Sequence, residues 1–133
     1  MVFCNEGGKI HGPGKIVFGK GIFQLCSYSN DFVVEDSSKI ILKDSAVVIL
    51  PDNYTLRLRG NTTSLVMKPG SKMMFGENSG IVCDSGAKVI ASDAAFTSVD
   101  SSKKWNGIFL KHRSQDTIKN CLISNNQSRN FIL

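Results

Sequence analysis

The sequence is a succession of short β-forming runs separated by small or polar residues. Four blocks align along the chain: IVFGKGIFQLC from Ile16, IILKDSAVVIL from Ile40, LVMKPGSKMMF from Leu65 and IVCDSGAKVIA from Ile81. Each block has an apolar run, two mostly polar residues, a small residue and a second run. No window of eleven or more residues keeps uninterrupted apolar spacing of the helical kind, so we expect an all-β protein.

Each block is best explained as a strand, a tight corner and a second strand. The predicted corners are Gly21, Ser45, Gly70 and Gly86, where the backbone needs a positive φ or a close approach. Such short strands cannot bury a face alone, so the blocks must stack on one another. The blocks start 24, 25 and 16 residues apart, and a partial fifth block follows 27 residues later. Insertions at the turns of a solenoid produce such irregular steps.

A parallel β-solenoid is therefore the expected fold, and its length of 133 residues fits one domain. The alternative is a β-sandwich or Greek-key barrel, which needs hairpins. Asn106-Gly107 is the only Asn-Gly or Asp-Gly dipeptide, the pairs that usually mark two-residue hairpin turns, and this favours the solenoid.

Residues 73–126 resemble the repeat unit of the pectin-lyase-like superfamily, in particular its bacterial exported and surface members. The phrase runs from an apolar-x-Phe run through Gly-Ile, Gly-Ala and Phe-Thr-Ser to a variable loop and Trp-x-Gly-Ile. The matching positions are Phe75, Gly80, Ile81, Cys83, Gly86, Ala87, Ala91, Phe96, Thr97, Ser98, Trp105, Gly107 and Ile108. The resemblance implies a right-handed, single-stranded parallel β-helix of about five or six coils, with residues 1–15 as an irregular lead-in or cap. It implies fold more than function, because this superfamily carries enzymes, adhesins and scaffolds.

The repeat register also predicts which side chains form the core, to within a slip of one residue. The predicted core positions are Val17, Ile22, Ile41, Val48, Val66, Met73, Val82, Val89, Phe96, Ile108, Ile118 and Ile123.

The charge pattern gives little direction about partners. The net charge is +5, but the sixteen Lys and Arg are scattered, with Lys103-Lys104 the only adjacent pair. Scattered lysines are typical of a solvated surface and point only weakly to anionic partners, so we expect no nucleic-acid binding. No apolar stretch is long enough to insert into a membrane. The apolar end SRNFIL predicts a fragment or module that stacks on further coils or self-associates there.

The four cysteines are at positions 4, 26, 83 and 121, with neither a C-x-x-C pair nor zinc-ligand spacing. Cysteines spread through strand-like runs behave as small apolar residues, so buried free thiols are favoured over disulfides. No metal site is expected.

Two segments hold the candidate ligand-binding residues. Trp105, beside Lys104, could stack on a sugar ring, although a plug that seals the core after the preceding loop is the favoured reading. The turn KHRSQD could hold an anionic group, although a plain polar turn is the favoured interpretation. Its charged and titratable members are Lys111, His112, Arg113 and Asp116.

Catalytic residues are not predicted. Asp84, Asp93 and Asp100, with Lys88 or Lys104, are the nearest candidates for a lyase site, but they form no motif. The expected function is therefore a non-catalytic stalk, adhesin or passenger module that is secreted or displayed at the cell surface and binds glycan or protein. The alternative is a polysaccharide lyase or glycoside hydrolase for acidic glycans. We expect no cofactor, with Ca²⁺ required only by the lyase alternative.

Overall fold

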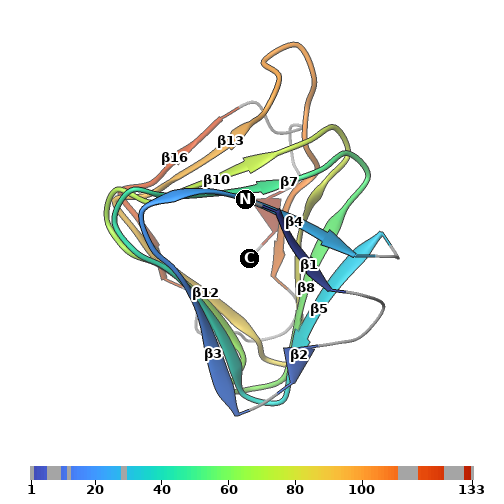
Figure 1. Ribbon diagram of the computed structural model, residues 1–133, viewed down its shortest axis with the longest axis vertical. Coiled ribbons are helices and arrows are strands. Elements are labelled where there is room, and N and C mark those ends of the chain that lie inside the picture. The colour runs from blue at the N-terminus through green and yellow to red at the C-terminus, as the bar shows by residue number, and fades with distance from the viewer. Residues whose placement is uncertain are drawn as a thin grey trace.

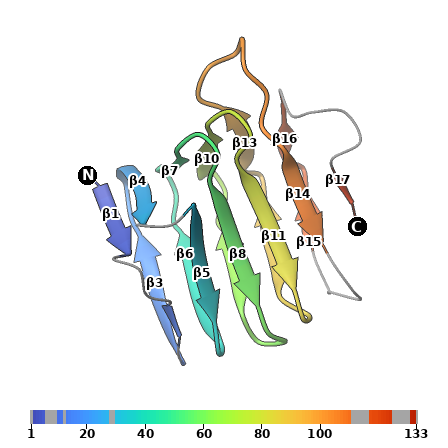
Figure 2. The ribbon, with the colours of Figure 1, turned by 90° about the vertical axis from the view of Figure 1, so that its right-hand side faces the viewer.

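The computed structural model describes residues 2–5, 10–11, 13–27, 30–110, 117–124 and 131–132. All regular structure in this part of the chain is β-strand. Successive strands pass from one side of a three-sided β-solenoid to the next (Figure 1), and each side is a parallel sheet. Figure 2 shows the strands of one sheet side by side along the stack. Among the described residues, no helix is long and apolar enough to span a membrane.

The three sheets are named A, B and C in the order in which each turn visits them from β4 onward. Sheet A contains β1 (Val2–Asn5), β4 (Gly21–Ser27), β7 (Ala46–Leu50), β10 (Lys72–Phe75), β13 (Ala95–Ser98) and β16 (Leu122–Ile123). Sheet B contains β2 (Ile10–His11), β5 (Asp31–Glu35), β8 (Thr55–Arg59), β11 (Gly80–Asp84), β14 (Gly107–Leu110) and β17 (Phe131–Ile132). Sheet C contains β3 (Gly14–Phe18), β6 (Ser38–Leu42), β9 (Ser64–Met67), β12 (Lys88–Ser92) and β15 (Thr117–Lys119).

The solenoid confirms the predicted fold class. From β3 to β14 the chain makes about four turns, and the outer strands bring sheets A and B to six strands and sheet C to five. We expected residues 1–15 to be an irregular lead-in or cap, but part of this segment forms strands. Val2–Asn5 and Ile10–His11 are strands in register with β4 and β5, so they extend sheets A and B. The right-handed sense of the coil stays a prediction.

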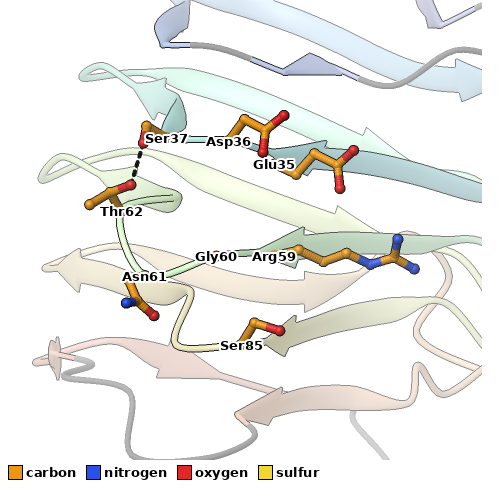
Figure 3. A pocket seen from close by; sticks show the side chains of 8 residues that line it. All are labelled: Glu35, Asp36, Ser37, Arg59, Gly60, Asn61, Thr62 and Ser85. Carbon is orange, nitrogen blue, oxygen red and sulfur yellow. Dashed lines mark hydrogen bonds between the residues drawn. The ribbon is translucent and has the colours of Figure 1, made fainter.

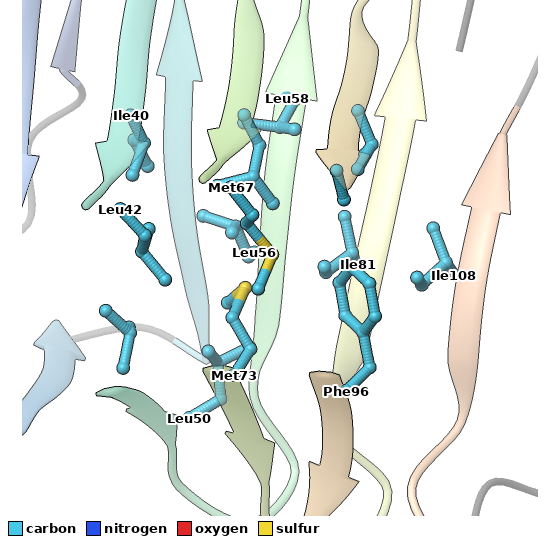
Figure 4. Close-up of a cluster of buried hydrophobic side chains, with 14 of the residues drawn as sticks. Ile40, Leu42, Leu50, Leu56, Leu58, Met67, Met73, Ile81, Phe96 and Ile108 are labelled. Atoms are coloured by element: carbon cyan, nitrogen blue, oxygen red, sulfur yellow. The ribbon is translucent and has the colours of Figure 1, made fainter. Parts of the chain in front are cut away.

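The core lies inside the coil, because alternate residues of each strand point inward. In β6 and β7 the buried side chains are those at the first, third and fifth positions. Figure 4 shows part of this core, in which side chains from all three sheets meet, among them Leu56, Met67 and Phe96. Burying each such side chain stabilises the fold by roughly 1.5–3 kcal/mol.

The predicted core register is right in part of the chain and shifted by one residue elsewhere. The predicted positions that are buried are Val48, Met73, Val89, Phe96 and Ile108. Ile118 and Ile123 are partly buried against the core. The positions that lie on the outer faces instead are Val17, Ile22, Ile41, Val66 and Val82. Ile22 is 62% exposed, so burial does not explain its apolar side chain.

The corners between sheets C and A show the true repeat of the chain. Ser45, Gly70, Asp93 and Asn120 have positive φ values and follow one another in steps of 25, 23 and 27 residues. The predicted corner Gly86 belongs to a different edge, between sheets B and C. The block from Ile81 therefore starts on sheet B, one side short of a full turn, and this explains its 16-residue step.

The cysteines do not all follow the prediction of free thiols. Cys83 is a buried free thiol and Cys121 is a half-buried one. Cys26, however, is disulfide-bonded. The backbone of Cys4 lies directly opposite Cys26 in the pairing of β1 with β4.

Candidate functional site

The corners between sheets B and C form a ridge on the surface of the solenoid. Residues 60–63 join β8 to β9, and the neighbouring corners, Asp36–Ser37 and residues 85–87, are shorter. Asn61 and Thr62 are exposed at the middle of this edge. We call the three corners together the Asn61 ridge.

Contacts between adjacent coils hold the Asn61 ridge in place. The hydroxyl groups of Ser37 and Thr62 are hydrogen-bonded, and the Ser37 N–H donates to Thr63 Oγ1 over 3.2 Å. On the other side, a Cβ atom at Gly86 would lie 2.6 Å from Asn61 Oδ1. Glycine at position 86 therefore leaves the space that the Asn61 amide fills, and its φ of +86° also favours glycine.

A groove of about 550 Å³ runs along the sheet B side of the ridge (Figure 3). Its lining residues are Glu35, Asp36, Ser37, Arg59, Gly60, Asn61, Thr62 and Ser85. Charges of both signs stand on this outer face. Arg57 Nε lies 3.6 Å from Asp31 Oδ2 and Arg57 Nη1 lies 3.8 Å from Asp84 Oδ2, so cation and carboxylates partner each other across three coils.

A second groove, of about 420 Å³, lies on the sheet C side of the same ridge. It shares Ser37, Asn61 and Thr62 with the first groove. Its remaining lining residues are Lys39, Ser64, Val66, Lys88 and Ile90. We call it the sheet C groove.

Ser64 lies at the centre of the sheet C groove. Ser64 pairs in register with Lys39 on one side and with Lys88 on the other. Ser64 is itself buried, with 2% of its surface exposed, so it forms the floor of the groove between the two lysines. Val66 and Ile90 pair in the next outward column, so the groove has both aliphatic and hydroxyl-bearing walls.

The outer face of sheet C, which we call the lysine face, carries six lysines in the part of the chain that the structure describes. One outward column holds Lys15, Lys39 and Lys88 together with Ser64. The opposite edge holds Lys43 and Lys68, which directly follow β6 and β9, and Lys119, which ends β15. Between them runs an aliphatic column composed of Val17, Ile41, Val66 and Ile90.

None of the described positions in these columns is acidic, and none of the six lysines forms an ion pair with another described residue. Lys15 and Lys39 are direct register partners. Adjacent strands lie about 4.8 Å apart, and like charges directly opposite each other are destabilising. The lysine face thus places like charges side by side within sheet C, and the carboxylates Asp44 and Asp93 lie at the corners that adjoin it.

A signal for the lysine face was present in the sequence. From Lys15 to Lys39 is 24 residues and from Lys39 to Lys88 is 49; from Lys43 to Lys68 is 25 and from Lys68 to Lys119 is 51. These intervals are close to one or two coil repeats. Lysines that look scattered in the sequence therefore align once the repeat length is known.

Trp105 is a core plug and offers no sugar-stacking surface. Its side chain is fully buried and stacks on Phe75, with ring centroids 4.1 Å apart and planes at 6°. The indole Nε1–H donates to the Ser124 carbonyl oxygen over 2.8 Å. Trp105 thus joins three successive coils, and the candidate ligand-binding role is wrong for this residue.

The loop before Trp105, residues 99–104, projects from the corner between β13 and β14 (Figure 2). Asp100 Oδ1 accepts hydrogen bonds from the Ser102 hydroxyl at 2.7 Å and from its N–H at 2.9 Å. These hydrogen bonds hold the pKa of the Asp100 carboxyl below its ordinary value of 3.8. The Lys104 side chain is exposed, and its carbonyl oxygen accepts from the Asn78 N–H. Neither of the two grooves described above includes Lys104.

The carboxylates considered for catalysis lie apart. Asp84 ends β11 beside the Asn61 ridge, Asp93 lies at a corner between sheets C and A, and Asp100 lies in the projecting loop between sheets A and B. They therefore occupy three different edges of the solenoid. In the described part of the chain, no group of three His, Cys, Asp or Glu side chains could hold a metal ion.

The turn with Lys111, His112, Arg113 and Asp116 lies outside the described residues, so its predicted role stays a prediction. Comparison with known proteins adds no assignment. The chain matches no protein-family model, and neither the curated proteins nor the solved structures include a significant match to it.

Proposed function

We propose that this chain is a non-catalytic β-solenoid module that binds an acidic glycan through the lysine face. The observation that carries the proposal is the charge on this face: six lysines of described position flank one aliphatic column, and no outward position of the described sheet C strands is acidic. Asp44 and Asp93 lie at the adjoining corners. Such a surface attracts anionic partners over about one Debye length, roughly 8 Å at physiological salt.

A glycan suits this surface because a sugar chain offers both anionic groups and apolar C–H faces. The aliphatic column supplies a partner for the C–H groups, while the lysines and the hydroxyl groups of the Asn61 ridge can hydrogen-bond the polar edges. The binding surface in this proposal is a sheet face, in contrast to the loops that the sequence favoured. Membership of the right-handed pectin-lyase-like superfamily remains part of the proposal.

A location outside the cell or at the cell surface is also proposed. The disulfide of Cys26 supports it, since disulfides persist in oxidising compartments and are rare in the cytosol. The enzyme alternative has less support, because Asp84, Asp93 and Asp100 stand at different edges.

A glycan array with purified protein tests the proposal, run beside an absorbance assay for uronate elimination. The proposal predicts binding to linear acidic glycans, no binding to neutral ones, and no new absorbance. Binding to neutral glycans alone, or to none, would overturn glycan binding through the lysine face. Steady product formation from an acidic glycan would favour the lyase alternative.

A further inference from the structure

We propose that the sheet C groove is the subsite for one acidic sugar unit, with its carboxylate or sulfate group held between Lys39 and Lys88. This inference rests on the proposed function and adds a defined site and ligand geometry to it. The lysine face supplies long-range attraction, whereas the groove supplies recognition at short range.

The spacing of the two lysines is the first argument. Lys39 and Lys88 lie on strands two steps apart in sheet C, with Ser64 between them. Two steps correspond to about 10 Å along the stack. The gap over Ser64 is therefore flanked by a cation on each side, and an anion placed there lies between two ammonium groups, each with three donors.

The walls of the groove are the second argument. One wall, the Asn61 ridge, carries two hydroxyl groups and an amide, from Ser37, Thr62 and Asn61. The opposite wall is aliphatic, from Val66 and Ile90. A pyranose ring has a polar edge and an apolar face, so this pairing fits a sugar better than it fits an inorganic anion.

The rigidity of the ridge is the third argument. Ser37 and Thr62 are hydrogen-bonded between coils, and Asn61 fills the space left by Gly86. Groups that are already held in place lose little freedom on binding, so they contribute more to affinity.

Nucleic acid and anionic membrane fit less well. The described lysine face has neither arginine nor an aromatic side chain, the groups that usually contact phosphates and stack on bases. A flat membrane would contact the aliphatic column but would make little use of the hydroxyl and amide groups of the Asn61 ridge. The side chains of the aliphatic column are also mostly half-buried, and only Val17, at 44%, is well exposed.

The experiment compares two double variants by calorimetric titration with oligogalacturonate, which carries carboxylates, and with a heparin oligosaccharide, which also carries sulfates. K39Q/K88Q removes the two groove lysines. K20Q/K72Q is the matched control, because both lysines are exposed, lie outside the strands of sheet C and carry the same charge. We expect K39Q/K88Q to weaken binding at least ~10-fold and to lower the slope of log affinity against log salt by about two. The control should change the affinity by less than ~2-fold.

A third variant separates recognition in the groove from charge. Ser64→Met fills the gap without changing the charge, and Thr97→Met, on a half-buried outward position of β13, is its control. We expect weaker binding by about 10-fold only for Ser64→Met, with both variants folded by circular dichroism. A larger loss of affinity for oligogalacturonate on Ser64→Met would point to a carboxylate in the groove, and a larger loss for the heparin oligosaccharide would point to a sulfate.

Several outcomes would overturn the subsite. If the wild-type chain binds acidic glycans but the groove and control variants lose affinity equally, the site is wrong and the proposed function stands. If the wild type binds neither glycan, both proposals fail. Tighter binding to phosphatidylserine vesicles or to single-stranded DNA than to either glycan would also contradict the sugar site.

Discussion

The outer faces of sheets B and C are built on one core from strands of similar length, yet they treat charge in opposite ways. On sheet B, Arg57 lies between Asp31 and Asp84, at 3.6 Å and 3.8 Å. On sheet C, Lys15 and Lys39 stand side by side with no described acidic partner. The first face pairs its charges within the fold, whereas the lysines of the second form no ion pair with a described residue and, in our proposal, bind an anion. This difference separates a structural surface from a candidate binding surface.

Both faces are expected to rest on one shared core, and Trp105→Ala tests this. Of the substitutions considered, it should lower the free energy of unfolding most. Trp105 is fully buried and contacts Phe75 from the preceding coil and Ser124 from the following one. Truncating a buried Trp costs about 3–5 kcal/mol, so we expect a large loss in the free energy of unfolding. Chemical denaturation with fluorescence from Tyr and with circular dichroism would measure it. Two separate transitions would contradict a shared core.

Loss of the disulfide should have the next largest effect on stability. A disulfide that stabilises the fold would support a location in an oxidising compartment for both faces. Cys26→Ser should lower the free energy of unfolding by roughly 2–4 kcal/mol under non-reducing conditions. Cys121→Ser, which changes a half-buried free thiol, is the control and should cost much less. Thiol titration of the unfolded, unreduced chain should find two thiols of the four cysteines; four would contradict the disulfide.

Charge substitutions on the two faces should give the smallest changes in stability, but these changes should have opposite signs on sheets B and C. Lys39→Glu replaces a like-charge neighbour of Lys15 by an opposite one and should stabilise the fold by about 0.5 kcal/mol. Arg57→Gln leaves two carboxylates of sheet B without their cation and should destabilise it by roughly 0.5–1 kcal/mol. Urea denaturation measures both. Both effects should shrink in 1 M salt, and equal signs would show that the two faces do not differ.

Much of the fold was predictable from the sequence because short strands, small corners and a repeat are local properties. The corners at Ser45 and Gly70 are where the pattern placed them. The core register was harder, because runs such as IIL and VVIL are apolar at every position. Alternation then cannot tell the inner face from the outer face, and Ile22 and Val17 were assigned to the wrong side.

The candidate site was less predictable, because it depends on register between residues that are 24–51 positions apart. Lys39 and Lys88 have no neighbouring charge in sequence, and Ser64 has no distinguishing feature before its place between them is known. The predicted plug at Trp105 was an easier case, since a buried indole after a polar loop follows from local sequence. Aligning lysines at multiples of the coil repeat would have found the lysine face.

Amide chemical-shift mapping tests the central claim most directly. The labelled wild-type chain would be titrated with oligogalacturonate or heparin oligosaccharide, whichever binds it more tightly. If the glycan binds in the sheet C groove, we expect the largest amide chemical-shift changes on β6, β9 and β12, around Lys39, Ser64 and Lys88. Shifts centred on β5, β8 and β11, or on the loop of residues 99–104, would contradict it.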